Sequence, residues 1–217
     1  MEVYNENSNK MLLINIPYTG SSSRVECCRK FMGLKQGEKW FLREKHSKLE
    51  DLEDLIKKDN YEIVIFVRNP YEIFISNFIR FNLKTDEKTE SEIKYEISKW
   101  FKINKWKKFI GFKQSDFFKI NNKLKLKENI YYYENLEKDW KKACDKCNLP
   151  SEKLNILNPK ELENESSYLK EEYLKTEKLR YDNRGNHNKY LNKEQKKLIY
   201  EHFKEDFINF NYESDLD

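Results

Sequence analysis

The seven-residue run Tyr61–Val67, YEIVIFV, is the feature that most limits the possible folds of this chain. It is almost entirely apolar, as expected for a β-strand that is covered on both faces of a parallel sheet. Asn69 then provides a helix cap and Pro70 a first helical residue, with Glu72 at the third position. A buried strand that passes directly into a helix predicts an α/β fold with a mainly parallel sheet.

A second junction of this kind lies near the N-terminus. Met11–Ile16 predicts another buried strand, the loop Pro17–Ser23 follows it, and apolar residues then recur at helical spacing up to Gly33. Hydroxyl groups and backbone N–H groups at such a turn suit an oxyanion, because they meet the positive end of a helix. The loop fits a serine-rich helix cap without a ligand as well. It is not the P-loop pattern GxxxxGK[ST], because no lysine follows its glycine.

Arg68 ends the strand YEIVIFV, and a cation at the end of a buried strand is costly unless an anion meets it. A structural ion pair with an aspartate or glutamate would also compensate the charge of Arg68. Because ligands collect at the carboxyl ends of parallel strands, both junctions are expected to face one crevice. Arg68 and Ser76, which lies two helical turns beyond Pro70, therefore fit a second anion subsite.

The rest of the chain is expected to form further elements around these junctions. These are a strand at Lys39–Leu42, a helix opened by the capping box Ser47–Glu50, a helix from Ser91 to about Phe112, a turn at Gln114–Phe118, a strand at Asn129–Tyr133, a helix at Leu136–Cys147, a surface excursion at Ser151–Lys178 and a final helix capped by Asn192–Gln195. The inward positions are expected to be Leu49, Leu52, Leu55, Ile56, Phe74, Ile75, Phe78, Ile79, Ile93, Ile97, Trp100, Phe101 and Trp106. The final helix is expected to carry Leu198, Ile199, Phe203 and Phe207.

Length and charge narrow the class of protein. With 217 residues we expect a polar tail at 1–10 and one domain at 11–212. Lysine and arginine (42) nearly balance aspartate and glutamate (38), which argues against general nucleic-acid binding. No secretory or membrane-spanning pattern is found, so we expect a soluble, cytoplasmic protein with reduced cysteines. Cys144 and Cys147 form a CxxC without a second pair, and are interpreted as incidental helix cysteines rather than a zinc site.

These junctions carry a family resemblance. IPYTGSSS, Ile16–Ser23, resembles the IPKTGGTS motif of sulfotransferases, which binds the 5′-phosphosulfate of 3′-phosphoadenosine 5′-phosphosulfate. IFVRNPYEIFIS resembles their FVRNPYERLVS motif, whose Arg and Ser bind the 3′-phosphate and fall here on Arg68 and Ser76. The similarity is closest to carbohydrate-type sulfotransferases and covers about residues 11–212. Weaker similarities are found at Trp106–Gln114, Tyr131–Leu136 and Glu201–Tyr212.

The resemblance implies a three-layer, P-loop-like sulfotransferase fold with a parallel sheet flanked by helices. It also implies transfer of a sulfuryl group, without a metal, to a hydroxyl or amine of a glycan or similar acceptor, leaving adenosine 3′,5′-bisphosphate. His46, between the two motifs, is the implied catalytic base and Glu44 the alternative. The implied donor-binding residues are Pro17, Tyr18, Thr19, Gly20, Ser21, Ser22, Ser23, Arg24, Arg68 and Ser76.

Tyr18 is the main departure from the family pattern, because it replaces the lysine that contacts the leaving group. Tyrosine can donate one neutral hydrogen bond and brings no charge, a loss of about 3 kcal/mol or roughly a hundredfold in rate. Arg24 is a candidate for a cation that replaces this lysine. Tyr18 itself is the second candidate catalytic residue, beside His46. Ile73 replaces the second arginine of the motif.

Three functions follow as hypotheses: a sulfotransferase, a catalytically silent nucleotide-binding protein, and a small-molecule kinase. The kinase is disfavoured by the missing P-loop lysine. The segment Asn183–Asn188 could close over the nucleotide or be an ordinary surface loop. The sequence predicts no particular acceptor and no oligomeric state.

Overall fold

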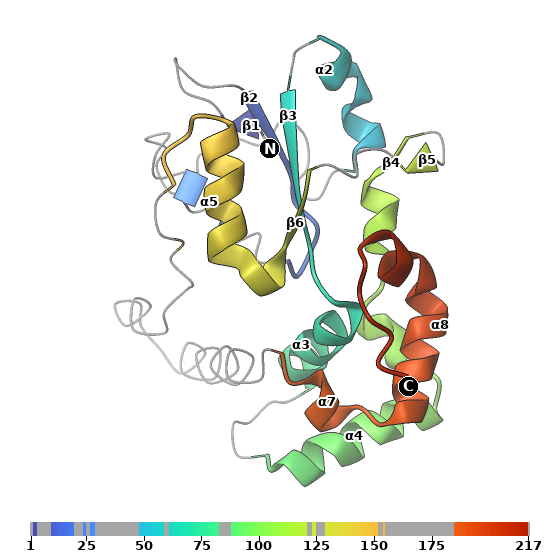
Figure 1. Ribbon diagram of the computed structural model, residues 1–217. Helices are drawn as coiled ribbons and strands as arrows, with labels where there is room; N and C mark the ends of the chain where they lie inside the picture. Colours follow the sequence, from blue (N-terminus) through green and yellow to red (C-terminus); the bar gives the residue numbers. More distant parts are fainter. Residues whose placement is uncertain are drawn as a thin grey trace, which may run out of the picture. The chain divides into compact units, whose positions relative to one another are not determined.

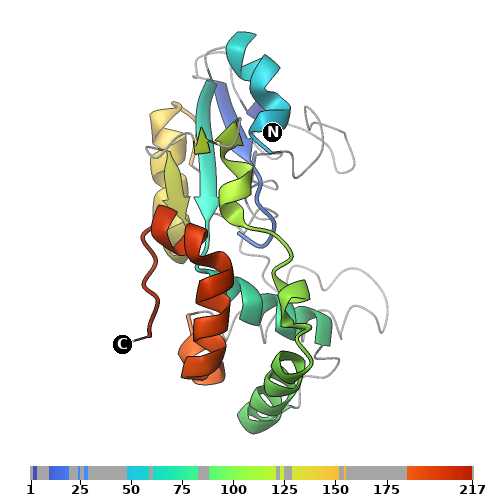
Figure 2. The ribbon, with the colours of Figure 1, turned by 90° about the vertical axis from the view of Figure 1, so that its right-hand side faces the viewer.

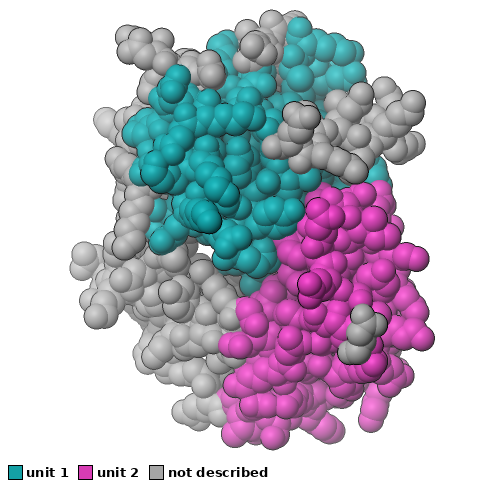
Figure 3. Space-filling model, viewed as in Figure 1, with its two compact units in different colours: residues 1–68, 114–156 teal, residues 69–113, 157–217 magenta. Residues whose placement is uncertain are grey.

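The computed structural model describes residues 2–3, 10–19, 24, 27–28, 48–58, 61–82, 88–120, 123–124, 129–151, 154 and 185–216. These residues belong to two compact units (Figure 3). Unit 1 is formed by residues 1–68 and 114–156, and unit 2 by residues 69–113 and 157–217. A single domain over residues 11–212 stays a prediction.

The sheet of unit 1 has the strand order β1-β2-β3-β6 (Figure 1). β2 (Lys10–Ile14), β3 (Tyr61–Val67) and β6 (Ile130–Tyr132) are parallel, and β1 (Glu2–Val3) pairs antiparallel with β2. The mainly parallel α/β sheet predicted from the sequence is thus confirmed. The first strand ends at Ile14 rather than Ile16, because Pro17 has no N–H for a ladder and restricts the residue before it.

Both faces of this sheet are buried, which explains why its strands lack an apolar–polar alternation. One face packs against α5 (Leu136–Lys146), which lies beside β6 in Figures 1 and 2. Leu12, Ile65 and Val67 alternate with the residues that face α5 and are equally buried. The core cluster on the α5 face contains Met11, Leu13, Cys27, Cys28, Val64, Phe66, Tyr131, Leu136, Trp140, Ala143, Cys144, Cys147, Leu149 and Leu154.

All four cysteines of the chain are buried as free thiols in this cluster. Burial raises the pKa of the Cys28 and Cys144 thiols well above the ordinary value, and that of Cys147 to about 11. Because the thiolate is the reactive form, these side chains are poor nucleophiles in the folded protein. The interpretation of Cys144 and Cys147 as structural helix cysteines agrees with this placement.

We therefore expect the four thiols to resist a thiol-specific reagent at neutral pH until the protein unfolds. Labelling followed by mass spectrometry should give unmodified chains in buffer and four modified cysteines per chain in denaturant. Rapid modification of Cys144 or Cys147 without loss of structure would contradict the burial seen here.

Unit 2 is helical. It contains α3 (Pro70–Asn82), α4 (Glu90–Lys102), the 3-10 turn η2 (Trp106–Phe109), α7 (His187–Tyr190) and α8 (Lys193–Asn209). The predicted cap of α3 is confirmed, because the Asn69 side chain accepts a hydrogen bond from the Tyr71 N–H at 2.9 Å. The inward positions predicted on α3, namely Phe74, Ile75, Phe78 and Ile79, are all buried. Phe109 packs edge-on against Phe74 and Phe78.

The helix predicted from Ser91 to Phe112 is wrong in its second half. α4 ends at Lys102, because Asn104 takes a left-handed backbone with a φ of 52°, and η2 follows. It also begins one residue early, at Glu90, because Thr89 and Glu92 form a capping box that the sequence interpretation missed. Ile93, Ile97 and Trp106 are buried as predicted, whereas Trp100 and Phe101 are partly exposed.

The final helix and its cap agree with the prediction. Asn192 and Gln195 form the predicted capping box, with reciprocal hydrogen bonds of 2.9 and 3.0 Å. The buried stripe consists of Ile199, Phe203 and Phe207, which recur every four residues. Leu198 precedes that stripe by one residue, about 100° around the helix, and is 39% exposed.

The remaining elements are short. They are η1 (Glu50–Leu52), α2 (Glu53–Lys58), η3 (Gln114–Phe117), η4 (Tyr133–Asn135) and the unpredicted two-stranded pair β4 (Lys119–Ile120) and β5 (Lys123–Leu124). Leu49 and Leu52 are buried as predicted, and Ile56 is partly buried. Lys39–Leu42, Ser47, the Leu55 side chain and most of Ser151–Lys178 lie outside the described residues and side chains. Among the helices that are described, none is long and apolar enough to cross a membrane.

Candidate functional site

In unit 1, the turn Pro17–Thr19 follows β2 after two residues, Asn15 and Ile16. Tyr18 has a φ of 65°, a left-handed conformation that a bulky side chain rarely adopts. The Thr19 hydroxyl donates to the Ile16 carbonyl at 2.9 Å and so closes the turn. The first part of the predicted anion loop is therefore a tight, strained turn.

Arg24 is held by this turn. Its Nη2 donates to the Thr19 hydroxyl at 3.2 Å, its Nη1 donates to the Thr19 carbonyl, and its guanidinium stacks 4.1 Å from the centre of the Phe66 ring. The side chain is completely buried, and burial lowers its pKa to about 9. Its Nε has no hydrogen-bond partner among the described residues. Arg24 thus brings a positive charge to the base of the loop while it also braces the turn.

Arg68 follows β3 and is 4% exposed. Its backbone is fixed by Gln114, whose Oε1 accepts from the Arg68 N–H at 2.8 Å and whose Nε2 donates to the Arg68 carbonyl at 2.7 Å. The guanidinium lies 4.3 Å over the ring of Tyr133, and Nη1 donates to the Tyr18 carbonyl at 3.4 Å. The structure therefore brings together the strand ends that the sequence analysis placed at one crevice, although Tyr18 and Arg68 are 50 residues apart.

Gln114 is a buried clamp, and we expect Gln114→Ala to lower the free energy of unfolding by about 2–4 kcal/mol. Two hydrogen bonds would be lost and the buried N–H and carbonyl of Arg68 left without this partner, each at about 1–2 kcal/mol. Urea unfolding followed by circular dichroism measures the change. Gln114→Glu should lie between wild type and alanine, because the carboxylate can accept but not donate. A loss below about 0.5 kcal/mol for alanine would show that the clamp is dispensable.

The other predicted site residues are distributed as follows. Pro17 and Thr19 are in the turn just described, whereas Ser76 belongs to unit 2, where it is buried on the second turn of α3. The remaining candidates, Gly20, Ser21, Ser22, Ser23, Glu44 and His46, lie outside the described residues, so their roles stay predictions. Of the segment Asn183–Asn188, the structure describes Gly185 onward.

Tyr133 and Gln114 were not assigned roles from the sequence, although both lie in segments that resemble the family. Tyr133 directly follows β6, the third parallel strand, just as Arg68 follows β3. The rule that ligands gather at the carboxyl ends of parallel strands could therefore have singled it out. Gln114 opens the short turn η3 and carries no comparable pattern.

Unit 2 contains a buried charge cluster that the sequence analysis missed. The His187 Nδ1 lies 2.7 Å from Glu72 Oε1, and its Nε2 lies 2.8 Å from Asp215 Oδ2. Glu72 is the third residue of α3 and is 4% exposed. The sequence showed Glu72 only as a residue at the start of a helix and His187 only within the polar segment Asn183–Asn188. The cluster itself was not visible, because His187 and Asp215 are 115 and 143 residues away from Glu72.

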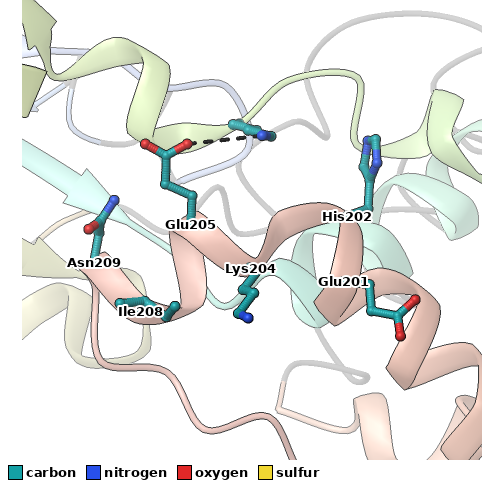
Figure 4. Close-up of a pocket in the computed structure, with 7 residues that line it drawn as sticks. Glu201, His202, Lys204, Glu205, Ile208 and Asn209 are labelled. Carbon is teal, nitrogen blue, oxygen red and sulfur yellow. Dashed lines mark ion pairs between the residues drawn. The ribbon is translucent and has the colours of Figure 1, made fainter. Parts of the chain in front are cut away.

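A pocket of about 400 Å³ lies along α8 in unit 2 (Figure 4). It is lined by Lys113, Glu201, His202, Lys204, Glu205, Ile208 and Asn209, and Lys113 lies 4.0 Å from Glu205. Burial and the nearby Lys107 and Lys113 lower the pKa of His202, which favours its neutral form. None of the predicted donor-binding residues that the structure describes lines this pocket.

Comparison with known proteins identifies the family of this chain. The model of the sulfotransferase family matches residues 3–213, so the chain belongs to the sulfotransferase family. Searches of curated proteins and of solved structures gave no match. The parallel sheet flanked by helices agrees with the P-loop-like sulfotransferase fold expected from the sequence. A sulfotransferase activity in general follows from this membership.

Proposed function

We propose that the chain transfers a sulfuryl group from 3′-phosphoadenosine 5′-phosphosulfate to a hydroxyl or amine of a glycan or a similar acceptor. The observation that carries this proposal is the hydrogen bond between Arg68 and the Tyr18 carbonyl, which joins the two motif segments in unit 1. A buried guanidinium beside a tight turn suits a phosphate, because Arg–phosphate hydrogen bonds are charge-assisted and often bidentate.

In this proposal the turn and Gly20–Ser23 bind the 5′-phosphosulfate, and Arg68 and Ser76 bind the 3′-phosphate. The acceptor oxygen or nitrogen attacks the sulfur, the bond from sulfur to the bridging oxygen breaks, and adenosine 3′,5′-bisphosphate leaves. His46 or Glu44 takes the acceptor proton. Catalysis then depends on neutralising the charge that develops on the leaving phosphate.

Tyr18 supports a second candidate, a protein that binds the nucleotide without transferring sulfate. The turn places a neutral phenol where the family motif has a cation. Arg24, six residues beyond Tyr18, offers a buried charge that is hydrogen-bonded to Thr19, and a charge in a low-dielectric site acts over several ångströms. The sulfotransferase proposal therefore assigns Arg24 the electrostatic part of the missing lysine.

A transfer assay distinguishes the two. Purified protein is incubated with sulfur-labelled donor and a panel of glycans that carry free hydroxyl or amino groups. Label on any acceptor, formed together with the bisphosphate, supports the enzyme and removes the silent alternative. Bisphosphate binding without transfer to any panel member favours the silent protein, and a preference for ATP over the sulfonucleotide would favour the kinase.

A further inference from the structure

The cluster around His187 links two parts of unit 2 that are distant in sequence. Glu72 accepts hydrogen bonds from the backbone N–H groups of Gly185 and His187 at 2.9 and 3.0 Å. The neighbouring Tyr71 donates its hydroxyl to the Ser214 carbonyl at 2.5 Å. The first turn of α3 therefore holds both the segment 185–188 and the C-terminal residues 214–215.

The donor and acceptor inventory favours a doubly protonated His187. A carboxylate can only accept hydrogen bonds, and a neutral imidazole has only one N–H to donate. Both ring nitrogens of His187 lie within hydrogen-bond distance of a carboxylate, at 2.7 Å from Glu72 and 2.8 Å from Asp215. Only the doubly protonated imidazolium satisfies both ionised partners.

The groups around His187 come from three parts of unit 2. Glu72 and Tyr71 on α3 and Asp215 in the C-terminal segment contact the imidazole, and Lys196 on α8 contacts Asp215. Lys196 lies 3.6 Å from Asp215 and also binds Asn188, and the Tyr71 ring stacks on the imidazole at 5.2 Å. Among the residues that the structure describes, two carboxylates lie at contact distance and one cation, Lys196, lies nearby, which favours a charged His187.

We propose that His187 is a positioning residue whose positive charge fastens the segment 185–188 and the C-terminal residues to α3, the helix that carries Ser76. When the imidazole loses a proton, one of its two carboxylate bonds must be lost. Asp215 is the partner that can leave, because its side chain is 26% exposed and lies outside any helix or strand, whereas Glu72 is buried in the first turn of α3. The consequence for nucleotide binding rests on the proposed function, in which Ser76 contacts the 3′-phosphate.

The direction of the pH effect follows from the surroundings. Burial opposes the charge on His187, but its hydrogen bonds to Glu72 and Asp215 outweigh burial and raise the pKa of His187 above the ordinary 6.5. The attachment of the segment 185–188 and the C-terminal residues to α3 is thus complete below pH 6.5, and it is lost as the pH rises through the raised pKa of His187. Burial also disfavours the Asp215 carboxylate, yet His187 and Lys196 lower its pKa, so it stays ionised through this range.

The first test follows protonation and docking without any ligand. The chain has three histidines, so ¹⁵N chemical shifts of the imidazoles can be assigned with one variant per histidine. Hydrogen-exchange protection factors for residues 185–191 and 212–216 report docking at each pH. We expect His187 to titrate at a higher pH than His202, with protection of the C-terminal segment falling about tenfold for each pH unit above the pKa of His187.

Asp215→Asn is the decisive variant. The asparagine amide can donate to a neutral His187 while the other ring nitrogen donates to Glu72, so docking should no longer require the imidazolium. Asparagine also tolerates the left-handed backbone of position 215, where φ is 51°. We expect its C-terminal protection to be independent of pH, whereas the matched control His202→Gln should keep the wild-type profile.

The second test measures the affinity for adenosine 3′,5′-bisphosphate above about pH 7, where the phosphates of the ligand are fully ionised. Wild type should lose affinity about tenfold across the His187 titration, and Asp215→Asn should not. A His187 that titrates at or below 6.5, or protection that is equally pH-dependent in Asp215→Asn, would overturn the inference. Absence of nucleotide binding at every pH would overturn the donor proposal instead, while the exchange data still decide the role of His187.

Discussion

Arg68→Ala is expected to weaken the binding of adenosine 3′,5′-bisphosphate by about a hundredfold or more. The guanidinium is buried, oriented by the ring of Tyr133, and held by the clamp of Gln114 on its backbone, so it is preorganised for an anion. A charge-assisted pair of hydrogen bonds to a phosphate contributes about 3 kcal/mol or more, which corresponds to this change in Kd. Isothermal titration calorimetry measures it.

Two further variants separate this effect from instability. Arg68→Lys keeps the charge but loses the planar fork and the stacking, so an intermediate loss of about tenfold is expected. Arg80→Ala, at the exposed end of α3, is the matched control and should bind like wild type. If Arg68→Ala bound the bisphosphate within about threefold of wild type while remaining folded, Arg68 would not be a phosphate ligand.

Tyr18→Lys is expected to raise the rate of sulfate transfer by roughly a hundredfold. The lysine restores a charge-assisted contact to the leaving oxygen, an effect of about 3 kcal/mol on the transition state. The left-handed backbone at this position, with φ at 65°, strains lysine no more than it strains tyrosine, so stability should change little. The measurement is label transferred per unit time at saturating donor.

Tyr18→Phe and Tyr18→Met serve as controls because they keep a large side chain without a charge. Phenylalanine reports the contribution of the phenol hydroxyl, and methionine that of the ring. If all three variants transferred sulfate at the same rate as wild type, position 18 would not contact the leaving group. A gain for lysine that is larger in the Arg24→Met background than in wild type would show that both cations act on the same charge.

The sheet and its junctions could be predicted from the sequence because they depend on local patterns. YEIVIFV is a buried strand from its composition alone, and Asn69-Pro70 begins a helix by cap chemistry. The approach of Arg68 to Tyr18 then follows from the parallel pairing of β2 with β3, since both residues come just after their strands. In this part of the chain, strand composition, helix capping and parallel strand pairing all predict that the two junctions lie close together.

The parts that could not be predicted depend on contacts between distant residues. Gln114 acts through its side-chain amide on the backbone of Arg68, and no periodicity marks such a residue. His187 was seen only within a polar segment, because its role depends on its contacts with Glu72 and Asp215, which are distant in sequence. Asp215 also lies beyond the predicted end of the domain. The early end of α4 was missed because Asn104 takes a left-handed turn that an apolar pattern does not reveal.

The most direct measurement is calorimetric titration of the wild-type protein with adenosine 3′,5′-bisphosphate, with adenosine 5′-monophosphate as the ligand that lacks the 3′-phosphate. The proposed function predicts a Kd in the micromolar range or tighter, about −8 kcal/mol, and at least about tenfold weaker binding of the monophosphate. Equal affinities would contradict a dedicated 3′-phosphate subsite at Arg68 and Ser76. No detectable binding of the bisphosphate would contradict the sulfonucleotide donor itself.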